Sequence, residues 1–126
     1  MRIYVCVIVC GAIALLGSAS VHAQQPQSDG RDEYVSGIAD LPLVAGLTED
    51  VDAAIVFDKP SGRIIEAFAT GALTRAEVTA FYAHTLPELG WQRLGDLAFA
   101  RERELLRIVV SNDNGVLAVR FSLSPR

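Results

Sequence analysis

The chain is poor in cysteine and histidine, and this shortage removes several kinds of chemistry. Its 126 residues include two cysteines and two histidines. Cys6, Cys10 and His22 all precede Ala23, so His84 is the one residue of either kind beyond it. Cysteine–histidine nucleophiles and zinc sites of the usual nitrogen and sulfur type need more than a lone histidine. Such sites are therefore excluded from residues 24–126.

Other functional classes are excluded by what the chain has little of. It carries 11 basic against 15 acidic residues, a net charge of −4, and so lacks the basic surplus that binds nucleic acid or anionic lipid. No Gly-x-Ser-x-Gly elbow is present, which disfavours a serine hydrolase. We predict no catalytic residue, no metal site and no cofactor. An unrecognised hydrolase remains a minor alternative, and it would need two clustered carboxylates with raised pKa in a cleft.

The N-terminus is typical of a signal peptide. Arg2 supplies a positive charge, Ile3 to Leu16 is uncharged and mostly apolar, and small residues follow up to Ala23. The apolar run is shorter than the roughly 20 residues that a membrane-spanning helix needs. We predict cleavage near Ala23, localisation in the periplasm or outside the cell, and no stable membrane span after cleavage. An uncleaved anchor is the alternative.

The rest of the chain suits one domain preceded by a polar tether. Residues 24–40 begin with a run of Gln, Ser, Asp and Gly, and a polar run without periodicity favours disorder. The predicted domain organisation is therefore a signal peptide at 1–23, a disordered tether at 24–40 and a single domain at 41–126. Within that domain, Leu41 to Leu47 is expected to be an irregular segment packed at the edge.

Turn residues predict two hairpins. Lys59-Pro60-Ser61-Gly62 separates two β-rich runs, Ala53–Asp58 and Arg63–Ala69, because proline and glycine suit the positions of a tight turn. Asn114-Gly115 is a strong two-residue hairpin signal between Leu105–Ser111 and Val116–Ser124. This second loop places the large apolar residues on one face through the pairs Asp113–Val116, Val110–Val119, Ile108–Phe121 and Leu106–Leu123.

One amphipathic helix is predicted between the hairpins. Thr74 and Glu77 form a capping box, and an apolar stripe follows at helical spacing. Gly90 suits the left-handed position after a helix, which lets Trp91 fold back on Leu86 in a Schellman ending. His84 lies on the outward side of this helix, so we expect a solvated histidine, whereas Trp91 is expected to fill the core.

These elements predict an α+β domain: one helix packed on an antiparallel sheet of four to five strands, in the order β-β-α-β-β-β. This order counts the segment from Gln92 to Glu102 as one strand with a break at Gly95-Asp96. The hairpin followed by "FYxxxLPxLGW" and further strands resembles small exported proteins of proteobacteria whose function is not established. The resemblance spans Leu41 to Pro125 and implies a fold and a compartment, with no catalytic residue to carry over.

Strand alternation singles out one candidate surface. If Ile108 and Phe121 face the helix, the opposite face of the sheet, called the open face below, carries apolar side chains and a few charges. Apolar surface edged by charge is typical of partner sites. The candidate partner-binding residues are Glu66, Phe68, Leu105, Arg107, Val109 and Arg120.

Three functions follow from this reading. The first is a non-enzymatic exported interaction module, or envelope-assembly accessory, that binds an envelope protein through the open face. The second is a carrier or sensor of a small apolar ligand held between helix and sheet. The third is the hydrolase named above. Two arrangements of Leu41 to Leu47 remain open, since it either covers the open face or leaves it free, and no oligomeric state follows from the sequence.

Overall fold

The computed structural model describes residues 33–126, which form an α+β layer. The elements are β1 (Leu47–Glu49), the 3-10 turn η1 (Val51–Ala53), β2 (Ile55–Lys59), β3 (Gly62–Gly71), α1 (Arg75–Glu88), β4 (Gln92–Gly95), β5 (Ala98–Arg101), β6 (Glu104–Asp113) and β7 (Val116–Pro125). Within these residues no helix is long and apolar enough to cross a membrane.

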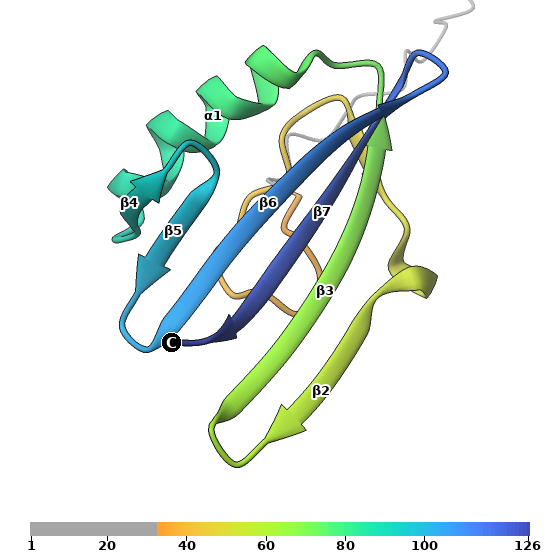
Figure 1. Ribbon diagram of the computed structural model, residues 1–126. Helices are drawn as coiled ribbons and strands as arrows, with labels where there is room; N and C mark the ends of the chain where they lie inside the picture. The colour runs from red at the N-terminus through yellow and green to blue at the C-terminus, as the bar shows by residue number, and fades with distance from the viewer. Residues whose placement is uncertain (1–32) are drawn as a thin grey trace, which may run out of the picture.

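The strands form one antiparallel sheet in the order β1-β3-β7-β6-β5-β4, with β2 also paired to β3 (Figure 1). The three central strands β3, β7 and β6 each have ten residues. β1 pairs with the end of β3 and β2 with its beginning. β1 and β2 therefore lie along the same side of β3, one after the other, and η1 connects them.

The predicted C-terminal hairpin is confirmed in register. β6 and β7 pair Asp113 with Val116, Val110 with Val119, Ile108 with Phe121 and Leu106 with Leu123. Asn114 and Gly115 both have positive φ, 51° and 82°, which is the conformation that an Asn-Gly loop of type I′ requires. The first predicted hairpin also forms, between β2 and β3, with Lys59 opposite Gly62.

Both predicted helix ends are confirmed. Thr74 and Glu77 form the reciprocal capping box, and the Thr74 backbone N–H and hydroxyl donate to the Glu77 carboxylate, which lowers its pKa. At the other end the Trp91 amide donates to the Leu86 carbonyl and the Gly90 amide to the Pro87 carbonyl. This is the Schellman pattern. The helix continues through Pro87 and ends in a tightened turn.

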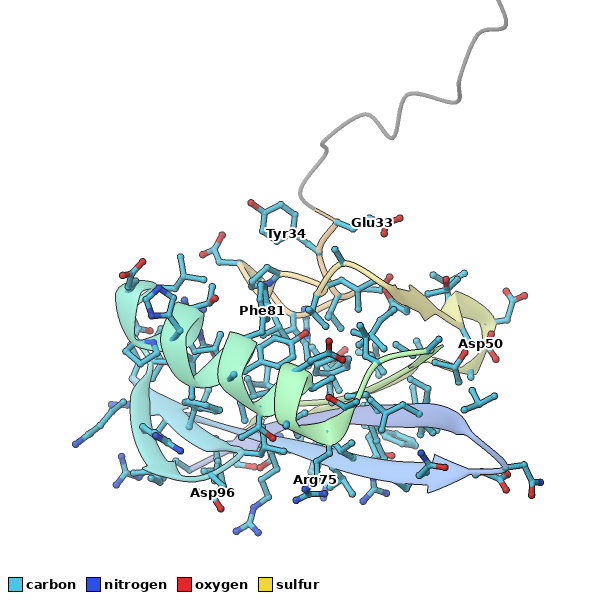
Figure 2. The ribbon with its side chains drawn as sticks, turned by 90° about the horizontal axis from the view of Figure 1, so that it is seen from above. Glu33, Tyr34, Asp50, Arg75, Phe81 and Asp96 are labelled. Carbon is cyan, nitrogen blue, oxygen red and sulfur yellow. The ribbon has the colours of Figure 1, made fainter. Side chains whose placement is uncertain are left out.

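Two segments cover the same face of the sheet. Helix α1 and residues 33–46 both lie on that side (Figure 2), called the covered face below. The Tyr82 hydroxyl of α1 donates to the Pro42 carbonyl at 2.9 Å, which joins the two segments. Leu41, Leu43, Val44 and Leu47 are buried in the same apolar cluster as Val78, Tyr82 and Leu86 of the helix. Leu41 to Leu47 thus packs beside the helix, and no described segment covers the open face.

The strand count and the domain boundary need correction. The sheet has seven strands rather than four to five. The broken strand after Trp91 is a hairpin of two strands, β4 and β5, and β1 was not expected. β1 forms because β3 extends beyond β2 and its far half would otherwise lack a partner on that side.

The core also begins before residue 41. Val35 and Ile38 are buried, and the chain closes on itself through the Val35 amide, which donates to the Leu41 carbonyl at 2.8 Å. Residues 33–40 therefore belong to the folded domain. Residues 1–32, which include the predicted signal peptide and most of the predicted tether, lie outside the described residues.

Candidate functional site

The open face brings all six candidate residues together. β3 contributes Glu66 and Phe68, β6 contributes Leu105, Arg107 and Val109, and β7 contributes Arg120. In the register of the sheet, Phe68 is opposite Arg120, which is opposite Val109. Side chains opposite one another in antiparallel strands lie on the same face. Because Ile65, Phe121 and Ile108 face the core, their neighbours along each strand must face away from it.

Arg120 has an apolar neighbour on each adjacent strand. It lies between Phe68 on one side and Val109 on the other, and Val109 is 46% exposed. The Arg120 side chain is itself exposed. A guanidinium flanked on both sides by apolar side chains favours a partner that brings a hydrogen-bond acceptor to it.

Arg107 occupies the adjacent row of the sheet. It is opposite Ser122, which is in turn opposite Glu66. Glu66 and Arg107 are thus two strands apart, roughly 9–10 Å between backbones at the usual strand spacing. Within residues 33–126, neither Arg107 nor Arg120 forms an ion pair with a described carboxylate. Two exposed arginines of other strands do: Arg63 of β3 pairs with Asp58, and Arg93 of β4 pairs with Asp96, each at 3.4 Å.

The open face extends further than sequence reasoning predicted. Ile55 is opposite Glu66, and Phe57 is opposite Ile64, so β2 adds two large apolar residues to this face. They are 41% and 59% exposed. A run of Ile, Val and Phe is typical of a buried strand, and only the pairing of β2 with a single neighbour reveals that it is at an edge.

The region between helix and sheet is filled by side chains. Tyr82, Leu86, Phe99 and Phe121 are fully buried there, and the Tyr82 and Phe121 rings meet edge to face with centroids 5.7 Å apart. Burial raises the pKa of Tyr82 above its usual range, and a hydrogen bond with the Val44 backbone opposes the shift only in part. This packing leaves little space for the apolar ligand of the second predicted function.

Arg101 was missed in the sequence and joins three parts of the domain. Its guanidinium lies 4.4 Å from the centre of the Trp91 ring and donates to the carbonyls of Leu89 and Ala39. A cation here complements the negative end of the helix. No local signal reveals this role, because Arg101 reaches the helix end only through the β4–β5 hairpin.

Two surface hollows of the described chain bring charged side chains together, and the one of about 370 Å³ is lined by Glu102 and Glu104 with Arg63 and Arg103 among others. The other, of about 630 Å³, lies between the outer side of α1 and the β4–β5 turn and is lined by Arg75, Ala76, Thr79, Ala80, Ala83, Arg93 and Asp96. In the described part of the chain, no group of three or more His, Cys, Asp or Glu residues lies close enough to hold a metal ion. His84 is exposed, as predicted.

Comparison with known proteins returned no relative: no family model, no curated protein and no solved structure matches the chain.

Proposed function

We propose that this chain is a non-enzymatic exported interaction module, an accessory in envelope assembly, whose open face binds an envelope protein. The observation that carries the proposal is the position of two exposed arginines beside apolar side chains on one face of the sheet. Arg107 and Arg120 project over apolar neighbours without a described carboxylate partner, whereas Arg63 and Arg93 each have one. Arginine is enriched and apolar area is concentrated at the centres of protein interfaces.

The partner expected from this chemistry carries carboxylates on an apolar surface. Two guanidinium groups in adjacent rows of one face repel each other mildly. A partner that supplies Asp or Glu side chains relieves this repulsion and covers Phe68 and Val109 in the same contact. Glu66, diagonal to Arg120 across the β3–β7 pair, adds an acceptor that favours a partner with a nearby donor.

A photo-crosslinking experiment identifies the partner and then tests the face. A photoreactive amino acid at Val109 is irradiated in intact cells, the crosslinked protein is identified, and its binding to the purified chain is measured by calorimetry. Arg107→Glu plus Arg120→Glu is expected to weaken binding by at least about 100-fold, since loss of buried charge pairs costs several kcal/mol. Arg63→Glu plus Arg93→Glu makes the same change in net charge outside this face and is the matched control. Equal binding by a folded double variant of the open face contradicts the proposal.

The compartment is tested separately. Signal-peptide cleavage near Ala23 is supported by the order and length of the charged, apolar and small-residue regions. N-terminal sequencing of the exported product is expected to start at or near Gln24. A mature product that retains Met1 to Leu16 contradicts export by cleavage.

A further inference from the structure

The exposed edge of the sheet at β2 differs from the opposite edge. All five residues of β2 are exposed, and β3 is its only described partner. Its first three residues, Ile55, Val56 and Phe57, are 41%, 52% and 59% exposed. Sheet edges are usually protected by charge, bulges or short strands. The opposite edge, β4, is protected in this way, with Arg93, a terminal glycine and an irregular register at Gly95.

The register of the β2–β3 hairpin determines which backbone groups of β2 are free. Lys59 and Gly62 close a two-residue turn, so they form the hydrogen-bonded pair nearest the loop. Such pairs alternate along an antiparallel ladder. Phe57 and Ile55 therefore direct their N–H and C=O groups toward β3, whereas Val56 and Asp58 direct theirs outward. An added strand must hydrogen-bond to Val56 and Asp58.

We propose that this edge pairs, antiparallel and about a two-fold axis at Val56, with β2 of a second copy of the chain. In this register Val56 is opposite Val56 of the second copy, and Ile55 is opposite its Phe57, twice by symmetry. Asp58 is opposite Ala54, and Lys59 lies beyond the paired residues, beside η1 of the second copy. Apolar residues meet apolar residues on both faces, and neither charged residue of the strand is opposite a charge of the same sign.

The other registers with matching backbone groups are poor. A pairing centred on Phe57 places Val56 opposite Asp58 and Ile55 opposite Lys59, so each apolar side chain except Phe57 meets a charge. A pairing centred on Asp58 places this carboxylate opposite its own copy, and like charges directly opposite are unfavourable. Pairings centred on Ile55 or Ala54 bring residues of β2 against η1 of the second copy, which is a 3-10 turn and not extended backbone. Self-complementarity of sequence and charge therefore selects a second copy of this chain, in one register.

The contact is short, and this limits its strength. η1 ends at Ala53, one residue before the strand, and Pro60 follows the strand; proline has no N–H to donate. Since only β2 takes part, the interface is below the roughly 1,200 Å² of a standard stable complex. We expect a dimer with a dissociation constant in the micromolar range. Both open faces would lie on the same side of the joined sheet, but the pairing does not depend on the proposed function of that face.

Sedimentation velocity over a concentration series tests the pairing, with protein purified from expression of the full chain. The native sequence is expected to shift from monomer to dimer as concentration rises. Val56→Lys places two lysines opposite each other at the axis and is expected to weaken dimerisation at least about tenfold. Val116→Lys is the matched control, because Val116 is 49% exposed but lies beside the β6–β7 turn. A monomer throughout, or a dimer insensitive to Val56→Lys, overturns the proposal.

A disulfide trap tests the register without depending on that variant. In a chain with Cys6→Ala and Cys10→Ala, Val56→Cys places two thiols opposite each other at about 5.5 Å between Cα atoms, within disulfide range. Mild oxidation is expected to give a covalent dimer far faster than for Phe57→Cys, whose thiol is opposite Ile55. Faster crosslinking of Phe57→Cys overturns the register. A chain that stays monomeric and uncrosslinked while β2 binds a strand of another protein overturns pairing with a second copy.

Discussion

The two faces of the β6–β7 hairpin are built from alternate residues of the same strands and differ in burial and in charge. On the covered face, Ile108 opposite Phe121 and Val110 opposite Val119 are buried. On the open face, the intervening pair is Val109 opposite Arg120, and both are exposed. Buried and exposed residues thus alternate along each strand. Stability is expected to depend on the first set and binding on the second.

The largest effect is expected at the centre of the covered face. Phe121 is fully buried, lies opposite Ala67 and Ile108, and contacts the Tyr82 ring edge to face. Phe121→Ala leaves a cavity that small neighbours such as Ala67 cannot fill, so we expect a loss of about 4 kcal/mol in the free energy of unfolding. Urea denaturation followed by circular dichroism measures it. A loss below about 1 kcal/mol would show that the layers repack freely.

The next effect compares two residues of one helix end. Trp91 is 2% exposed and lies under Arg101, whereas His84 is exposed on the outer side of α1. Trp91→Ala is expected to cost about 3 kcal/mol. His84→Ala should change the free energy of unfolding by no more than about 0.5 kcal/mol. Thermal or urea denaturation of both variants provides the measurement, and equal effects would contradict this account of the helix end.

Much of this contrast was predictable from the sequence, because local signals determine it. The Asn-Gly loop sets the β6–β7 register, and that register alone assigns Arg107, Val109 and Arg120 to one face. The capping box and Gly90 likewise define the ends of α1 within the chain segment that contains them. The strict alternation of large apolar residues along β7 supports the same register without information from any distant part of the chain.

The features that were missed depend on pairing between distant segments. β1 has three residues, too few for alternation to be visible, and it exists because β3 offers it an edge. Val35 and Ile38 have polar and small neighbours in the sequence. They are buried only because residues 33–46 fold over Ile65 beside the helix. Arg101 meets Trp91 only through the β4–β5 hairpin. The exposure of β2 depends on which strand lacks a second neighbour, and no local pattern records that.

A moderate effect is expected from the hydroxyl that joins the two covering segments. Tyr82→Phe removes the hydrogen bond to Pro42 and should lower the free energy of unfolding by about 1 kcal/mol near neutral pH.

The same hydroxyl makes the free energy of unfolding depend on pH in the alkaline range. Burial raises the pKa of Tyr82 in the folded chain, so folding favours the protonated phenol. Its contribution is present below the unfolded-state pKa of about 10 and is lost as pH rises above it. The native chain is therefore expected to lose stability above about pH 10 more steeply than Tyr82→Phe. Denaturation midpoints from pH 8 to 11 measure this difference, and parallel curves would contradict it.

The smallest effect is expected on the open face, and there the sign matters more than the size. Arg107 is exposed in the row next to Arg120 and has no described ion-pair partner. Arg107→Thr removes a repulsion between like charges and introduces a residue that suits a strand, so we expect a gain of about 0.3 kcal/mol in the free energy of unfolding at low salt. Because the repulsion is screened, the gain should shrink at about 0.5 M sodium chloride.

Arg103→Thr, in the turn between β5 and β6, is the control and should show no such salt-dependent gain. A loss of more than about 1 kcal/mol from Arg107→Thr would mean that this arginine stabilises the fold itself, and the separation between a face for folding and a face for binding would fail at this position.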